Sequence, residues 1–308
     1  IVEVEGSGEN VNNFDYLHQD LADNIVYYND PIQTILPHGT FVAGCASAVT
    51  DNNFGLSSIG FNSSLMLYRG ASENNWIDAV SRGARIINCS YLTCFPSIHT
   101  NNIVNMLTSM GVIIVGGAGN GIYPLDHPTS PGANRQSCGD FGNGLGYPAS
   151  YQNVFSISSI GEDNKHWDLT DGSGARHTNN EMVDFCAPGY RVLSTFPNNN
   201  WGRSSGTSFS SPISAGVIAL VLSVNKCLMF DDVKQILQST TDPIVDASNY
   251  PGMLGTGRLN AYNAVLLAQT YGQAPAITSN TIWNDEKFVS GIVSIEPNVT
   301  LTITSEIK

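Results

Sequence analysis

Charged side chains are scarce in this sequence, and basic ones are the scarcest. Asp, Glu, Lys and Arg make up only 13% of the 308 residues, and 13 Lys and Arg stand against 26 Asp and Glu, a formal net charge of −13. No basic cluster interrupts the acidic background, so nucleic acid and anionic membrane surfaces are poor partners. Low charge together with abundant Asn, Ser, Thr and Gly is more typical of a secreted protein than of a cytosolic one.

Metal-binding cysteine motifs, long apolar runs and an initiating methionine are also missing. The six cysteines form no CxxC motif and no Cys/His cluster, which argues against structural zinc. We expect one or two disulfides near the loops, with Cys45 and Cys186 as buried thiols. No apolar run approaches the about 18 residues that a bilayer-spanning helix needs. The chain begins at Ile1 without a signal sequence, so we expect a mature or trimmed form.

The stretch 206–212 reads GTSFSSP and leads directly into the apolar run 213–222. The pattern predicts a buried helix with Pro212 in its first turn, where the missing N–H is no loss. Ser208 would then lie at the helix N-terminus, where backbone N–H groups favour developing negative charge. On this feature alone, a serine at such a position is most often a helix cap.

A second stretch changes that interpretation. Residues 37–44 read PHGTFVAG, which is again a reactive side chain, then Gly and Thr, then an apolar helix. Together the two stretches resemble the histidine and serine blocks of the subtilisin-like serine proteases. The resemblance implies that Ser208 is a nucleophile and that His38 is its general base.

The third member of the family's catalytic set is an acid at the end of the first catalytic strand. Here 1–5 alternates with period two and runs into Gly6-Ser7-Gly8, so it predicts a strand and a tight turn. Glu5 stands where the family usually has Asp, with one extra residue in the turn. An alternative alignment puts Gly6 at the acid position and leaves no acid. Glu5 is also compatible with an ordinary solvated carboxylate at a strand end.

An apolar run at 112–115 predicts a buried parallel strand, and it ends in the glycine-rich segment GGAGNG at 116–121. Glycines at a strand end allow another backbone to approach closely. In the family this segment, here with Gly117 and Ala118, lines the primary specificity pocket. The resemblance implies that Asn120 donates an amide N–H to the oxyanion, although an isolated Asn-Gly is usually only a turn.

Residues 88–92, NCSYL, resemble the family strand that pairs with the substrate backbone. The resemblance implies substrate-binding roles for Ser90, Tyr91 and Leu92. Leu92 replaces the usual glycine, which changes the expected depth of the specificity pocket.

The segment 18–21, HQDL, resembles the family's His-Pro-Asp-Leu, and 50–56, TDNNFGL, is an oxygen-rich turn. In many family members the corresponding acid and loop bind a structural calcium ion, so Asp20 and Asp51 are candidate metal ligands. Asn and Asp in a turn need no metal. The chemistry itself requires no cofactor.

Strands alternating with helices predict a parallel sheet covered on both faces. The expected fold is therefore a three-layer αβα subtilisin-like fold with a mainly parallel sheet. The expected peptidase domain is 1–272. Residues 273–308 are expected to form a β-rich extension, the start of a truncated repetitive module, with strands near 281–283, 289–295 and 300–304.

The sequence thus predicts a secreted serine endopeptidase that acts on protein or peptide substrates as a monomer, with no nucleic-acid partner and no membrane span. The alternative is a catalytically degenerate subtilisin fold that binds peptides or a protein partner, motivated by Glu5, the uncertain alignment at Gly6, and Leu92. A surface adhesion protein, suggested only by the β-rich tail, is a third and weaker interpretation.

Overall fold

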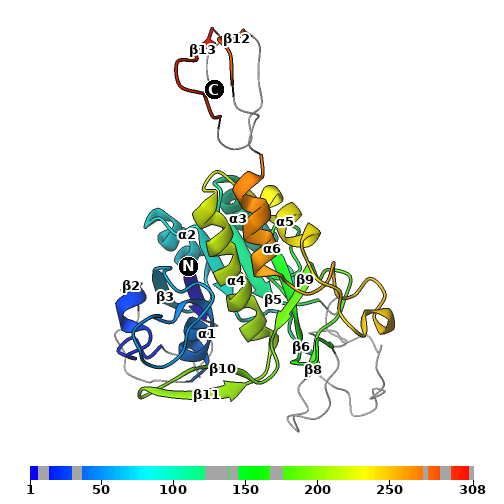
Figure 1. The fold of residues 1–308 in the computed structure, drawn as a ribbon. Helices are drawn as coiled ribbons and strands as arrows, with labels where there is room; N and C mark the ends of the chain where they lie inside the picture. Colours follow the sequence, from blue (N-terminus) through cyan, green and yellow to red (C-terminus); the bar gives the residue numbers. More distant parts are fainter. Residues whose placement is uncertain are drawn as a thin grey trace.

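The computed structural model describes residues 1–5, 14–29, 37–121, 138, 145–166, 176–272, 277–284 and 293–304. Helices and strands alternate along most of this chain (Figure 1). The helices are α1 (Pro37–Ser47), α2 (Glu73–Ser81), α3 (Ile98–Ser109), α4 (Thr207–Val224), α5 (Phe230–Ser239) and α6 (Ala261–Thr270), with short 3₁₀ turns at Ala22–Asn24 and Ala247–Asn249. The strands are β1 (Val2–Glu5), β2 (Ile25–Tyr28), β3 (Leu65–Arg69), β4 (Ile86–Cys89), β5 (Ile113–Gly117), β6 (Asn120–Gly121), β7 (Phe155–Ile160), β8 (Arg176–His177), β9 (Phe185–Pro188), β10 (Val192–Phe196), β11 (Asn200–Ser204), β12 (Thr281–Trp283) and β13 (Leu301–Ile303).

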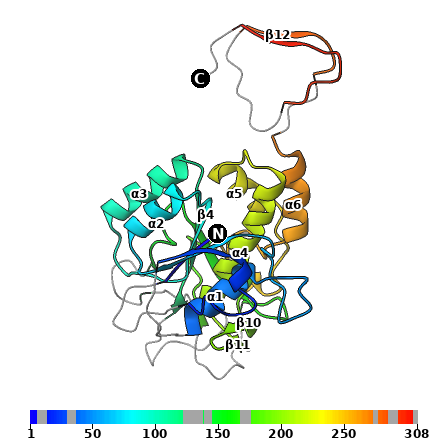
Figure 2. The ribbon, with the colours of Figure 1, turned by 90° about the vertical axis from the view of Figure 1, so that its left-hand side faces the viewer.

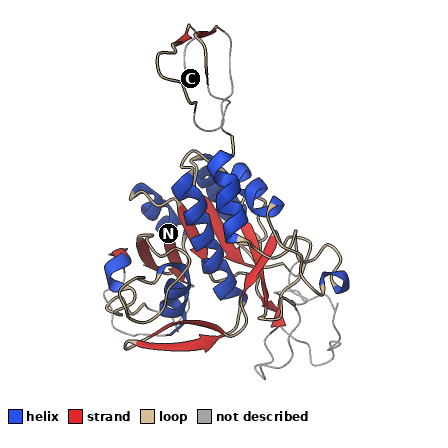
Figure 3. Cartoon of the chain, viewed as in Figure 1, coloured by secondary structure: helices blue, strands red, loops and turns tan. Residues whose placement is uncertain are grey.

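A seven-stranded sheet in the order β2-β3-β1-β4-β5-β7-β9 forms the centre of the molecule (Figure 3). Every neighbouring pair in it is parallel. The central strands β4, β5 and β7 are buried along their whole length, as expected of parallel strands covered on both faces. The prediction of a three-layer αβα fold is confirmed.

Helices cover both faces of this sheet (Figure 2). On one face α4, α5 and α6 pack on β5 and β7, where Ile113 and Phe155 belong to the same apolar cluster as Val217. On the other face α2 and α3 pack on β4 and β5 through a second cluster that includes Trp76 and Leu107. The hairpin of β10 and β11 packs against α1 near the N-terminus of that helix.

The apolar run after Ser208 forms α4, as predicted, but the helix begins earlier than expected. Because α4 starts at Thr207, Pro212 lies in its second turn and not in its first. Within the described part of the chain, α4 is also the one helix long and apolar enough to cross a membrane, and 67% of that stretch is buried inside the protein. The apolar residues of α4 are therefore mostly part of the protein core.

Past α6 the chain leaves the main body and forms the small pair of β12 and β13 (Figure 1). The two strands are parallel, with Thr281 beside Leu301 and Trp283 beside Ile303. The strand expected at 281–283 is present as β12, and the one expected at 300–304 is present as the slightly shorter β13. The strand expected at 289–295 lies mostly outside the described residues. The turn expected at Gly6-Ser7-Gly8 lies outside them as well.

Candidate active site

Ser208 is the second residue of α4 and is half-buried. Gly206 is the residue before the helix. The first backbone N–H groups of α4 lie beside the serine, and, as at any helix N-terminus, they have no hydrogen-bond acceptors within the helix itself. The Ser208 Oγ lies 3.4 Å from the Ser90 carbonyl oxygen, while the Ser90 Oγ donates to the Ser208 carbonyl at 2.8 Å. The serine is therefore held between the N-terminus of α4 and the end of β4.

His38 is the second residue of α1 and is also half-buried. Its ring centroid lies 5.9 Å from that of Phe209, the residue after Ser208. Phe209 in turn packs on Phe41 one helical turn further along α1, with ring centroids 4.3 Å apart. The aromatic contacts thus bring the N-termini of α1 and α4 together, and His38 lies beside the first turn of the serine helix.

Asn120 follows β5 and also lies beside the N-terminus of α4. Its Oδ1 accepts the backbone N–H of Thr207 at 3.0 Å and lies 3.3 Å from the Thr207 hydroxyl. Because Oδ1 faces these donors, the Nδ2 group is directed away from Thr207 and keeps its N–H bonds for another acceptor. The side chain is exposed, as a group that meets a substrate has to be.

Two of the predicted substrate-binding residues, Ser90 and Gly117, lie against the segment that carries Ser208. Ser90, Tyr91 and Leu92 follow β4, and Leu92 is half-exposed. Gly117 is the last residue of β5, and Ala118 follows it. A Cβ atom on Gly117 would lie 2.9 Å from the Thr207 carbonyl oxygen. Glycine at 117 therefore lets the end of β5 touch the start of α4.

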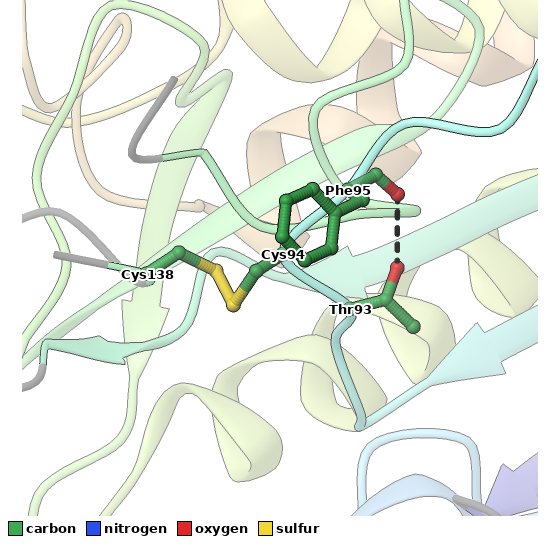
Figure 4. Close-up of a disulfide and its surroundings, with 4 residues drawn as sticks. All are labelled: Thr93, Cys94, Phe95 and Cys138. Carbon is green, nitrogen blue, oxygen red and sulfur yellow. Dashed lines mark hydrogen bonds between the residues drawn. A yellow bond between two sulfur atoms is a disulfide. The ribbon is translucent and has the colours of Figure 1, made fainter. Parts of the chain in front are cut away.

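A disulfide joins Cys94, two residues beyond Leu92, to Cys138 (Figure 4). Thr93, the residue before Cys94, forms a backbone bridge with Tyr147, with N–H···O distances of 2.7 and 2.9 Å. Cys45 and Cys186 are buried free thiols, as expected. Burial raises the pKa of Cys45 to about 12, so this thiol, although carried by the same helix as His38, stays protonated and is no nucleophile.

Glu5 ends β1, and its backbone pairs with Arg69 of β3. The Glu5 side chain is outside the described part of the structure, so its role as the acid stays a prediction. The residue that sequence reasoning missed is Glu3, which is completely buried two positions earlier. Its signal was present, because period-two alternation in 1–5 places Glu3 and Glu5 on the same face of a strand that a parallel sheet buries.

Asp20 is completely buried, and its Oδ2 accepts the Leu56 N–H at 2.9 Å and the Trp201 indole N–H at 2.7 Å. Its Oδ1 is buried with no hydrogen-bond partner, which fits one ligand of a hard cation. Asp51 is exposed. Among the described residues, no group of three or more His, Cys, Asp or Glu side chains is arranged to hold a metal ion.

The candidate residues gather at one edge of the sheet. Ser90 and Asn120 follow the carboxyl ends of β4 and β5, and Glu5 is the carboxyl end of β1. Open α/β sheets place their ligands at this edge. The arrangement is thus that of a doubly wound α/β protein with a serine, a histidine and an amide assembled beside the N-terminus of a buried helix.

The profile of the subtilase family (Peptidase S8) matches residues 10–272, and the chain belongs to this family. Among its relatives, the thermophilic serine proteinase of Bacillus sp. strain AK1 is 29% identical over 267 residues, covering 82% of this chain and 59% of that protein. Thermitase of Thermoactinomyces vulgaris is 28% identical over 264 residues, covering 80% of this chain and 84% of thermitase. Subtilisin-like protease 1 of Plasmodium falciparum is 28% identical over 239 residues, covering 72% of this chain and only 34% of that protein.

Two solved structures share the fold. The prenylagaramide maturation protease PagA superposes with a TM-score of 0.66 at 21% identity, covering 87% of this chain and 92% of that one. A protease of Pseudoalteromonas arctica PAMC 21717 gives a TM-score of 0.65 at 23% identity, with coverages of 87% and 89%. The three-layer architecture described above is therefore the architecture of known proteases.

Proposed function

We propose that this protein is a secreted serine endopeptidase that hydrolyses peptide bonds in proteins through an acyl-enzyme on Ser208. The observation that carries the proposal is the meeting of His38, Asn120 and Ser208 at the N-terminus of α4, from three segments far apart in the sequence. Membership of the subtilase family supports the same reaction class.

In this reaction His38 accepts the proton of the Ser208 hydroxyl as the oxygen attacks the substrate carbonyl, and it later delivers that proton to the leaving amine. The oxyanion of the tetrahedral intermediate accepts N–H bonds from Asn120 Nδ2 and from the Ser208 backbone, where the helix N-terminus adds favourable potential. Glu5 orients the imidazole and stabilises its protonated form. The substrate peptide binds between residues 90–92 and residues 117–118.

A fluorophosphonate probe tests the nucleophile directly. Wild type is expected to be labelled at Ser208, and Ser208→Ala should lose labelling and about 10⁶-fold in kcat. Ser223→Ala, on the exposed far end of the same helix, is the matched control and should react like wild type. Absence of labelling in folded wild-type protein would instead favour a subtilisin fold that binds peptides without turnover.

Asn120 and Glu5 have separate tests. Asn120→Ala should lower kcat by about 10²–10³-fold, because one oxyanion donor is lost. Glu5→Gln should slow hydrolysis at least about tenfold, because an amide does not stabilise the imidazolium. Unchanged rates for Glu5→Gln would show that the acid lies elsewhere or is absent.

We also propose that Asp20 contributes its unpartnered Oδ1 to a structural calcium ion beside the loop 50–56, with Asp51 as a weaker candidate ligand. The ion would stiffen the loop and take no part in the chemistry. Calcium should raise the Tm of wild type and EDTA should lower it, whereas Asp20→Asn should respond to neither. A wild-type Tm that is the same in calcium and in EDTA would reject the site.

Secretion is supported by the disulfide between Cys94 and Cys138, because such bonds persist in oxidising compartments. We expect the protein in the culture medium of its source cells as a monomer, with this disulfide formed. Thiol titration after unfolding without reductant should find four free cysteines, those that the structure leaves unpaired.

A further inference from the structure

Glu3 places a carboxyl group beneath α4, the helix that carries Ser208. The proposed reaction does not use this carboxyl group. The side chain is completely buried on β1. Parallel pairing of β1 with β4 sets Glu3 beside Asn88, and the Glu3 Oε2 accepts the Asn88 Nδ2–H at 2.6 Å. A fully buried carboxyl group is costly unless it is hydrogen-bonded, so its bond to Asn88 matters for the stability of this site.

Asn88 is the next member of the chain of hydrogen bonds. Besides Glu3, its Nδ2 donates to the Ser90 Oγ at 2.9 Å, and its Oδ1 accepts the Ser211 hydroxyl. Because the Glu3 oxygen lies opposite the amide nitrogen, the amide has one orientation, with Nδ2 toward Glu3 and Ser90 and Oδ1 toward Ser211. Without an acceptor at residue 3, that orientation would lose one of its bonds.

Pro212 explains why the hydrogen bond from the Ser90 hydroxyl to the Ser208 carbonyl matters. Since α4 begins at Thr207, the carbonyl of Ser208 would normally accept the N–H of residue 212, but proline has none. The Ser90 Oγ fills that position and donates to the Ser208 carbonyl at 2.8 Å. The hydroxyl of Ser90 points this way because its oxygen already accepts from Asn88.

We infer that Glu3 is a positioning residue for Ser208: its carboxyl group orients the Asn88 amide, which fixes the hydroxyls of Ser90 and Ser211 on the first turns of α4. The inference rests on the proposed function in so far as Ser208 is the nucleophile. Ser211 and the Ser208 carbonyl are the two points at which Asn88 and Ser90 hold the helix. A small movement there displaces the nucleophile from its attack position, and an error of about 1 Å can cost about 10²-fold in rate.

The first experiment replaces the acceptor. Glu3→Met and Glu3→Val remove it, whereas Glu3→Gln keeps an oxygen for the Asn88 Nδ2–H. The two acceptor-free variants should label with a fluorophosphonate about 10- to 100-fold more slowly and lose kcat with little change in KM. Glu3→Gln should recover most of the rate. Wild-type labelling by a folded Glu3→Met or Glu3→Val variant would overturn the inference.

Asp184→Leu is the matched control. Asp184 is another buried carboxyl, which accepts the Ser156 N–H at 2.9 Å and pairs with Lys234 at 2.8 Å, and neither partner belongs to the serine helix. If removing any buried carboxyl merely loosened the fold, Asp184→Leu and Glu3→Met would slow labelling alike at equal loss of Tm. The inference requires that only the Glu3 variants slow it.

A second measurement needs neither activity nor a folded variant. In wild-type protein, the NMR side-chain amide protons of Asn88 should exchange with solvent at least about 10²-fold more slowly than those of Asn153, whose Nδ2 donates to Asn105 Oδ1 on the surface. Equal exchange rates would refute the fixed Asn88 amide. If wild type reacts with no probe, the proposed function fails, and this measurement still tests whether the Asn88 amide is held in one hydrogen-bonded orientation.

Discussion

Gly44 lies in α1, where the β10–β11 hairpin crosses the helix that carries His38. A Cβ atom at this position would fall 2.5 Å from the Ser194 Oγ and closer still to the Thr195 Oγ1. Those hydroxyls donate to the carbonyls of Phe41 and Thr40, each at 2.7 Å. Gly44→Ala therefore forces the hairpin away from α1 at its points of attachment.

The size of the effect follows from three contributions. Overpacking a well-packed contact typically costs about 1–3 kcal/mol. Loss of the two hydroxyl bonds adds about 1 kcal/mol each. Alanine gains back at most about 1 kcal/mol over glycine in a helix interior. The free energy of unfolding should therefore fall by about 2–4 kcal/mol.

Urea unfolding measures this loss, and fluorophosphonate labelling measures its effect at the site. Because α1 carries His38, labelling of Ser208 should slow in Gly44→Ala under conditions where the protein stays folded. Thr195→Ala removes the nearest obstructing atom, so Gly44→Ala/Thr195→Ala should lose at least about 1 kcal/mol less than the two single changes together. Strict additivity, or a Gly44→Ala protein as stable as wild type, would refute the reasoning.

Three further changes test other parts of the molecule. Cys94→Ser opens a loop of 44 residues closed by Cys138, and the loop-entropy estimate gives a loss of about 4 kcal/mol in unfolding free energy; a loss below about 1 kcal/mol would contradict it. Trp201→Phe removes the indole bond to Asp20 and should cost about 1.5–3 kcal/mol in urea unfolding, with an unchanged midpoint as the opposing result. Burial raises the pKa of the Asp184 carboxyl in the folded state, so the native state holds the carboxyl proton more tightly than the unfolded state. The free energy of unfolding should therefore fall as pH rises from about 4 through that pKa. Asp184→Asn should flatten this dependence on pH. An equally steep slope in Asp184→Asn would assign it to other groups.

The fold was predictable where a pattern is local. The apolar run ending in Gly117 and the one after Ser208 each specify a buried element by themselves, and the order of the motifs places them in one sheet and one helix layer. The position of Pro212 in the second turn was not predictable in this way, because the Thr207 N–H at the start of α4 binds Asn120, a residue 87 positions earlier in the chain. The bond from Trp201 to Asp20 likewise joins residues 181 apart, and no periodicity reports such a contact.

The pairing of β1 bears on the choice between Glu5 and Gly6 as the acid position. Glu3 lies beside Asn88 and Val4 beside Cys89. Glu5 is the next residue after Val4, and Ser90, whose hydroxyl binds the Ser208 carbonyl, is the next residue after Cys89. The alternative alignment would put a glycine at the acid position one step beyond that level and leave the carboxyl of Glu5 unassigned. We therefore propose Glu5 as the acid, and Glu5→Gln should lose more activity than Glu3→Gln.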